Sequence, residues 1–158
     1  EKAKGNSHSL SLDLFDQWQS MKKNAQWRFT PPTHVLAAFY QALKEHEEEG
    51  GIDGRFRRYS ENCKIICEGM KEMGFTQLLS KELQAPIIIT FMQPPNTNFK
   101  FEEFYNTLSN KNFLIYPGKL TVAETFRVGC IGHLNSNDMY DALKAINETI
   151  KELNIKLT

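Results

Sequence analysis

The sequence has few cysteines, no excess of charge of one sign and no long apolar run, the features that most readily reveal the class of a protein. It has three cysteines among 158 residues and no CxxC pair, which excludes a disulfide framework and a thiol-rich zinc site. Nineteen basic and nineteen acidic residues cancel, so the net charge gives no reason to expect nucleic acid or an anionic membrane as partner. No apolar run reaches the about 20 residues of a membrane span, and the start, EKAKGNSH, has no hydrophobic signal core. We therefore expect a cytoplasmic protein that binds neither nucleic acid nor membrane.

Short catalytic signatures are also missing. The sequence has no G-x-G-x-x-G, no P-loop and no serine in a nucleophile elbow. His34, His46 and His133 are scattered, without a second ligand at metal spacing, so we expect no metal site. Any chemistry must then depend on single residues that the fold places.

The apolar pattern predicts a small α/β unit. Helical spacing marks four segments, near residues 32–49, 55–73, 101–110 and 137–153. Apolar runs bounded by turn residues mark three strands, near residues 86–92, 112–116 and 125–131. Gly50 or Gly51 can supply the left-handed end of the first helix. From about Gly54 onward the order of the elements predicts a short sheet with helices packed on it, a two-layer α/β sandwich.

The first residues have a different pattern. In SLSLDLF, Leu10, Leu12 and Leu14 alternate with polar residues, which is typical of a strand or an extended arm. No earlier segment of this sequence could pair with such a strand. We therefore expect the chain to be cut from a longer one.

The stretch WRFTPPTH, residues 27–34, places two prolines between Thr30 and Thr33, just before the first predicted helix. A residue before proline takes the extended conformation of an N-cap, and proline suits the first helical turn, so Thr30 can be a purely structural cap. The same arrangement, a hydroxyl beside free N–H groups at a helix N-terminus, also suits a phosphate. These residues alone leave both interpretations open.

Arg127 is the most informative single residue, because it interrupts the apolar strand TFRVGCIG. With a period of two it shares a face with Gly129 and Ile131, and the residues between them face the other side. Gly129 leaves room for a ligand, and the planar guanidinium fits a carboxylate, phosphate or phosphonate. An internal ion pair with one of the many acidic residues is equally compatible with the sequence.

A specific resemblance is carried by six segments, taken in order: SLSLDLFDQW, WRFTPPTHVLAAFYQAL, GFTQLL, PIIITF, FLIYPGKLT and FRVGCIG. Together they resemble the C-terminal part of the class V aminotransferases of the type I pyridoxal-phosphate fold that act on 2-aminoethylphosphonate and pyruvate. The resemblance implies that residues 1–53 are the distal, incomplete segment of a large cofactor domain. It implies that residues 54–158 are the C-terminal small α/β domain, and that the full-length enzyme is a homodimer.

The resemblance also assigns roles to two residues. In such enzymes the threonine before the prolines reaches the phosphate of pyridoxal 5′-phosphate in the neighbouring subunit, and Thr30 occupies that place. The arginine of the FRxGxIG strand holds the acidic group of the substrate, and Arg127 occupies that place. The implied reaction transfers the amino group of 2-aminoethylphosphonate to pyruvate, giving phosphonoacetaldehyde and L-alanine.

The resemblance further implies that the Schiff-base lysine belongs to a segment preceding residue 1. Lys2 and Lys4 lie beyond the lysine motif of these enzymes and are not assigned. We therefore predict no catalytic residue within this chain and no activity of the chain alone. Two alternatives stay open: another class V aminotransferase, of the alanine–glyoxylate or phosphoserine type, and a noncatalytic α/β interaction domain that descends from such an enzyme.

Overall fold

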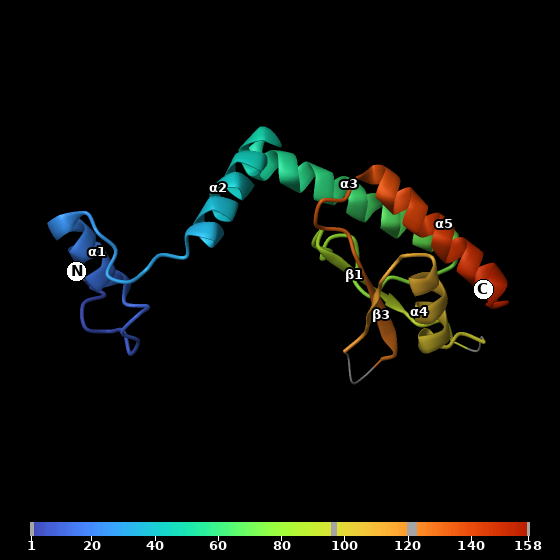
Figure 1. Ribbon diagram of the computed structural model, residues 1–158. Coiled ribbons are helices and arrows are strands. Elements are labelled where there is room, and N and C mark those ends of the chain that lie inside the picture. The colour runs from blue at the N-terminus through green and yellow to red at the C-terminus, as the bar shows by residue number, and fades with distance from the viewer. Residues whose placement is uncertain (1, 96–97, 120–122, 158) are drawn as a thin grey trace. The chain divides into compact units, whose positions relative to one another are not determined.

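The computed structural model describes residues 2–95, 98–119 and 123–157. In chain order (Figure 1), the described residues form α1 (Leu14–Asn24), α2 (Thr33–Glu48), α3 (Gly51–Glu72), β1 (Ile88–Met92), α4 (Phe101–Asn110), β2 (Tyr116–Pro117), β3 (Thr125–Gly129) and α5 (Ser136–Glu152). The chain divides into two units, Glu1–Glu48 and Glu49–Thr158, and each is described by itself. Within the described ranges, no helix combines the length and the apolar character needed to span a membrane.

In the first unit, residues 9–13, where the alternating pattern predicts a strand or an extended arm, form no strand, and α1 begins at Leu14. The carboxylate of Asp13 accepts a hydrogen bond from the amide of Asp16 at 3.0 Å and so caps α1. From Leu14 on, the apolar residues Trp18 and Met21 follow at helical spacing, and this pattern outweighs the short alternation before it.

Helix α2 lies within one residue of the predicted 32–49, but its cap is not Thr30. Its first helical hydrogen bond runs from the amide of Leu36 to the carbonyl of Pro32 at 3.0 Å, which puts Pro32 at the N-cap position. Of the two interpretations of Thr30, the purely structural one, a cap of this helix, is therefore contradicted. Each proline pushes the residue before it into the extended region, so the pair delays the helix until Thr33.

The end of α2 is as predicted. Gly50 and Gly51 have φ values of 98° and 65°, in the left-handed region, and they lead the chain into α3. The apolar stripe of α3 is buried only in its second half, around Ile66 and Met70, whereas Phe56 is 61% exposed.

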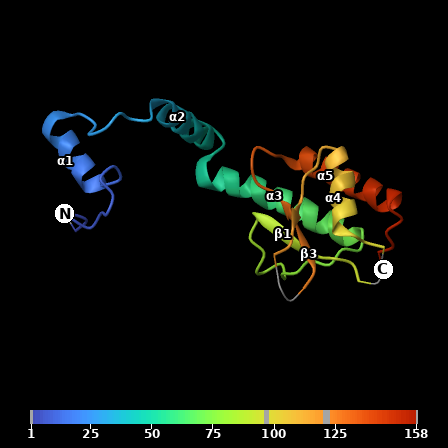
Figure 2. The ribbon, with the colours of Figure 1, turned by 60° about the horizontal axis from the view of Figure 1, so that its bottom comes forward.

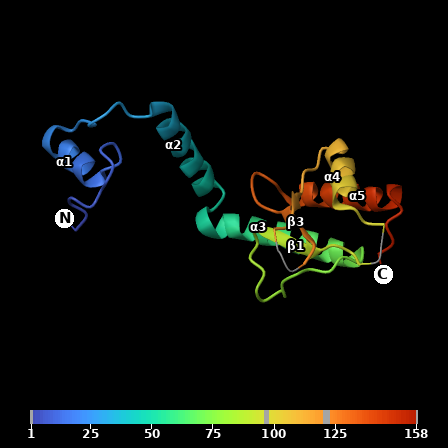
Figure 3. The same cartoon turned by 90° about the horizontal axis from the view of Figure 1, so that it is seen from below.

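The second unit contains a three-stranded antiparallel sheet in the order β1-β3-β2. Helices α3 and α5 lie side by side, and α4 packs against α5 (Figures 2 and 3). The predicted two-layer α/β arrangement is confirmed. Strand β2 is shorter and later than the predicted 112–116, because Asn112, with a φ of 68°, still belongs to the turn after α4 and Pro117 has no amide to extend the ladder.

A cluster of phenylalanine rings forms the centre of the core, between the sheet and the helices. The ring of Phe126, on β3, is fully buried. Its centre lies 5.5–6.4 Å from the ring centres of Phe75, Phe91, Phe99, Phe101 and Phe104. The central strand is thus fixed on one face by the core, which leaves its other face for a site.

Candidate functional site

Arg127 lies on the face of the sheet opposite the core, as its period of two predicts. Its neighbours Phe126 and Val128 are buried, whereas Arg127 and Gly129 are partly exposed. A Cβ atom added at Gly129 would meet no atom within 4 Å, so this face of the strand is open two residues beyond the arginine. The open space that a ligand needs is therefore present on the Arg127 face.

The contacts of Arg127 come from β2, not from an acidic residue. Its Nε donates to the carbonyl of Pro117 at 3.1 Å, and its guanidinium carbon lies 5.9 Å from the ring centre of Tyr116. Among the described residues no carboxylate lies within the 4.0 Å of an ion pair with Arg127, so the alternative interpretation, an internal ion pair, has no described partner. The two terminal nitrogens of the Arg127 guanidinium can bind an oxyanion. They make no hydrogen bond within the part of the chain that the structure describes.

Gly118 fixes the position of the Pro117 carbonyl that binds Arg127. Its amide donates to the carbonyl of Thr125 at 2.9 Å. A Cβ atom at Gly118 would collide with the hydroxyl and the backbone of Thr125. Glycine therefore allows the end of β2 to approach β3 closely, and this approach brings the carbonyl of Pro117 to the arginine.

Thr30 lies in the first unit and is exposed, beside the N-terminus of α2. The amide of Thr33 bonds to the carbonyl of Pro31 at 2.9 Å. The next two amides, of His34 and Val35, have no backbone acceptor among the described residues. Because Thr30 is not the cap, its hydroxyl is not committed to the helix, and the free amides beside it suit an anion.

A polar network between α3 and the loop after β3 was missed by the sequence analysis. Arg58 donates to the carbonyls of Gly132 and Leu134 at 2.6 and 2.7 Å. The buried amide of Asn62 donates to the carbonyls of Cys130 and Leu134 at 3.2 and 3.0 Å. The loop that follows the Arg127 strand is thus fixed by its backbone. No signal in the sequence could reveal these pairs, because any residue offers a carbonyl and the partners are up to 76 positions apart.

Glu49 anchors Arg58 in this network. Its carboxylate accepts hydrogen bonds from Nε of Arg58 at 2.6 Å and from Nε of Arg55 at 2.8 Å. These hydrogen bonds, that of Arg58 first, lower the pKa of Glu49 from 4.5 to about 2.

A carboxylate with a lowered pKa stabilises the fold above its unfolded pKa, and this contribution is lost as the pH falls toward the folded value. We expect the melting temperature of the chain to fall between pH 4.5 and about 2, and this fall to be shallower in Glu49→Gln. Glu48→Gln, at an exposed neighbour, is the control and should keep the original slope. Parallel profiles for Glu49→Gln and the unmodified chain would show that the carboxylate makes no such contribution.

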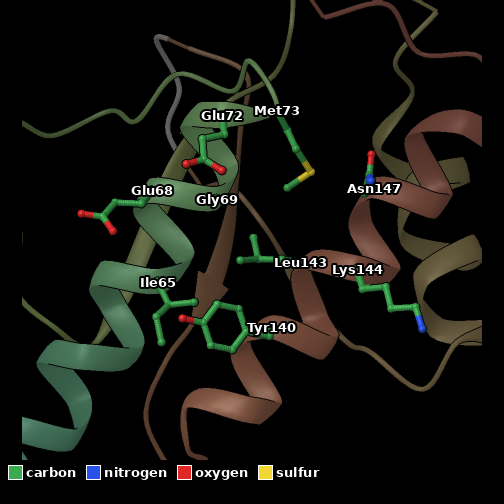
Figure 4. Close-up of a pocket in the computed structure, with 9 residues that line it drawn as sticks. All are labelled: Ile65, Glu68, Gly69, Glu72, Met73, Tyr140, Leu143, Lys144 and Asn147. Carbon is green, nitrogen blue, oxygen red and sulfur yellow. The ribbon is translucent and has the colours of Figure 1, made fainter.

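Figure 4 shows a separate cavity of about 540 Å³ between α3 and α5. Glu68 on α3 and Lys144 on α5 point away from each other, and Ile65, Tyr140 and Leu143 lie between them. Among the described residues that line it, the acidic and basic side chains do not converge, so this cavity is a weaker candidate than the Arg127 face. Within the described ranges no group of three or more His, Cys, Asp or Glu side chains could hold a metal ion.

The comparisons with known proteins agree with the fold and extend it. No protein-family model matches the chain. It is 50% identical over 155 residues to the 2-aminoethylphosphonate–pyruvate transaminase of Pseudomonas aeruginosa (strain UCBPP-PA14), covering 98% of this chain and 42% of the relative. The enzyme of the same name from Rhizobium meliloti (strain 1021) is also 50% identical, over 98% of this chain and 40% of its own. The chain thus spans less than half the length of these curated relatives.

Solved structures show the same fold at low identity. The pyridoxamine–pyruvate aminotransferase of Mesorhizobium loti matches with a TM-score of 0.79 and 18% identity, over 99% of this chain and 41% of the other. The ureidoglycine–glyoxylate aminotransferase of Bacillus subtilis matches with a TM-score of 0.73 and 17% identity, over 91% of this chain and 38% of the other. Over nearly its whole length the chain is therefore similar to 2-aminoethylphosphonate–pyruvate transaminases, and it has the fold of the C-terminal part of pyridoxal-phosphate aminotransferases.

Proposed function

We propose that the full-length protein containing this chain is a pyridoxal-phosphate-dependent transaminase that transfers the amino group of 2-aminoethylphosphonate to pyruvate, giving phosphonoacetaldehyde and L-alanine. The observation that carries this proposal is the 50% identity over 98% of the chain to relatives of that name. It favours this substrate pair over the alanine–glyoxylate and phosphoserine types, whose likeness to this chain is structural and at 20 and 21% identity. It also favours an enzyme over a noncatalytic interaction domain.

Arg127 is the residue that we propose to bind the acidic group of each substrate. The donor has a phosphonate and the acceptor a carboxylate, and each presents a pair of oxygens that a planar guanidinium binds bidentately. Support comes from the open face at Gly129 and from the lack of a described carboxylate partner for Arg127. In this role the arginine orients the substrate and takes no part in moving protons.

Thr30 is the residue that we propose to bind the cofactor phosphate. Pyridoxal phosphate, when bound, supplies the electron sink that amino-group transfer needs. The hydroxyl of Thr30 and the free amides of His34 and Val35 fit a phosphate, because a helix N-terminus favours negative charge and its N–H groups lack partners. We propose that the phosphate bound here is that of the neighbouring subunit in a cytoplasmic homodimer.

Replacing Thr30 by valine should weaken cofactor binding and leave the fold unchanged. The substitution keeps the side-chain shape and removes one hydrogen bond to a charged group, which is worth on the order of 1–3 kcal/mol. Cofactor affinity of the full-length protein, measured by equilibrium dialysis, should fall accordingly, and the melting temperature of the cofactor-free protein should not change. Thr33→Val is the matched control and should bind the cofactor more tightly than Thr30→Val. A lower melting temperature with unchanged cofactor affinity would return Thr30 to a structural role.

We propose that residues 1–53 belong to a large cofactor domain and residues 54–158 form the small domain. Support comes from the first unit, which buries no described side chain. Val35, Phe39 and Leu43, at successive turns of α2, are 65%, 60% and 49% exposed. An apolar stripe of this size is normally covered by another part of a protein.

The proposed activity is tested with the purified full-length protein. We expect pyridoxal phosphate to be required and alanine to form from 2-aminoethylphosphonate and pyruvate faster than with glyoxylate as acceptor or phosphoserine as donor. The chain of residues 1–158 alone should form none. A preference for glyoxylate or phosphoserine would reassign the substrate, and no transamination with any pair would favour the interaction domain.

A further inference from the structure

Two hydroxyl side chains flank Arg127 on the open face of the sheet. In the antiparallel ladders Arg127 on β3 lies directly opposite Thr90 on β1 and Tyr116 on β2. Residues in such pairs point to the same face of a sheet, and their Cβ atoms are about 4.5–5.5 Å apart. Thr90 is partly exposed, and Tyr116 is 55% exposed. The row Thr90–Arg127–Tyr116 therefore crosses the three strands on the face away from the core.

Both hydroxyls are free, but they differ in reach. Neither donates or accepts a hydrogen bond with any residue that the structure describes. The hydroxyl of Thr90 is bonded to its Cβ atom and so stays near the backbone of β1. The hydroxyl of Tyr116 lies at the far end of an aromatic ring, about as many bonds from Cβ as the terminal nitrogens of Arg127. Only Tyr116 is thus long enough to reach a ligand at the end of the Arg127 side chain.

The hydrogen bond of Arg127 places its guanidinium on the side of Tyr116. Nε donates at 3.1 Å to the carbonyl of Pro117, the residue after Tyr116 in β2. The guanidinium carbon lies 5.9 Å from the ring centre of Tyr116. Because β3 lies between β1 and β2, a guanidinium held by β2 is turned away from Thr90. An oxyanion on the terminal nitrogens of Arg127 therefore lies beside Tyr116.

We propose that Tyr116 recognises the phosphonate of the amino donor through its third oxygen, which the carboxylate of the acceptor lacks. The inference rests on the proposed function, in which Arg127 binds the acidic group of each substrate. A planar guanidinium binds two oxygens at once, so it satisfies both oxygens of a carboxylate and two of the three of a phosphonate. The hydroxyl of Tyr116 donates a hydrogen bond to the third. Tyr116 is thus a specificity residue that binds substrate and moves no proton.

The test replaces Tyr116 by phenylalanine in the full-length protein with pyridoxal phosphate bound. Phenylalanine keeps the ring beside the guanidinium and removes only the hydroxyl. The two substrates react in separate half-reactions, so kcat/KM for each reports on the binding of its own acidic group. We expect kcat/KM for 2-aminoethylphosphonate to fall about tenfold, the effect of one hydrogen bond to a charged group, and kcat/KM for pyruvate to be unchanged.

Two further variants are the comparisons. Tyr140→Phe removes the hydroxyl of a tyrosine on α5 that is 58% exposed, and both kcat/KM values should be unchanged. Thr90→Val removes the hydroxyl on the other side of Arg127, and it should lower kcat/KM for 2-aminoethylphosphonate less than Tyr116→Phe does. The melting temperatures of the three variants should match that of the unmodified protein, because none of the three side chains is in the core.

Unchanged kinetics of Tyr116→Phe, or equal losses with both substrates, would overturn the inference. Equal losses would mean that Tyr116 acts only by holding Arg127. A larger loss in Thr90→Val would overturn it as well and assign the third oxygen to Thr90. In each of these cases the unmodified protein still forms alanine from 2-aminoethylphosphonate and pyruvate. An unmodified protein that forms none would instead overturn the proposed function, and this inference with it.

Discussion

Replacing Arg127 by lysine in the full-length protein is expected to lower kcat/KM for 2-aminoethylphosphonate by about 10–100-fold, equivalent to the about 1.5–3 kcal/mol of one charged hydrogen bond. Lysine keeps the positive charge and loses the planar fork, so the phosphonate exchanges a bidentate contact for a single one. The hydrogen bond from Nε to the carbonyl of Pro117 is lost as well, which leaves the remaining ammonium poorly oriented. Steady-state kinetics with each substrate varied in turn measure the effect, and both KM values should rise because both substrates are acids.

Arg57→Lys is the matched control, since Arg57 is exposed on α3 and has no hydrogen bond or ion pair with a described residue. It should leave kinetics and stability unchanged. Cofactor affinity should be unchanged in both variants, because the cofactor phosphate is assigned to Thr30. Unchanged kinetics of Arg127→Lys together with a lower melting temperature would show that the arginine supports the fold and would remove the main residue-level support for the substrate.

Replacing Phe126 by alanine, one position earlier in the same strand, is expected to destabilise the second unit by about 3–5 kcal/mol. The ring is fully buried against five others, so its removal loses apolar burial and leaves a cavity that the neighbouring rigid rings fill poorly. Urea unfolding of the chain, followed by circular dichroism, should show a lower midpoint and a similar slope.

Phe39→Ala is the matched control on α2, where the ring is 60% exposed. In this chain it should change the free energy of unfolding by less than about 0.5 kcal/mol, as surface substitutions usually do. Equal losses in the two variants would mean that the second unit does not unfold around the Phe126 cluster.

The elements that could be predicted from the sequence are those with a long, regular apolar pattern. Helices α3 and α5 and strands β1 and β3 lie where the pattern predicts them, because several turns or alternations outweigh local ambiguity. The alternation of residues 9–13 was too short to form a strand, and Asp13 at its end caps α1. Helix α2 also lies within one residue of its prediction, but its cap is Pro32, because propensity alone cannot say which of two prolines the helix begins after.

The candidate site also has a part that the sequence predicts and a part that it does not. The face of Arg127 followed from the period of two, which the sheet preserves. The hydrogen-bond acceptor of the Arg127 Nε could not be predicted. It is the backbone carbonyl of Pro117, in a strand of two residues too short to show a pattern of side chains. The contacts of Arg58 were hidden for the same reason.

That a backbone carbonyl orients Arg127 has an electrostatic consequence. A carboxylate would hold the guanidinium equally well, but it would also neutralise it, and an incoming acid would have to compete with that partner. A carbonyl is a dipole without net charge, so the hydrogen bond from Nε to Pro117 fixes direction and leaves the full positive charge on the open face of the sheet. An acidic ligand therefore displaces only water, and salt in the medium is what weakens its attraction to this arginine.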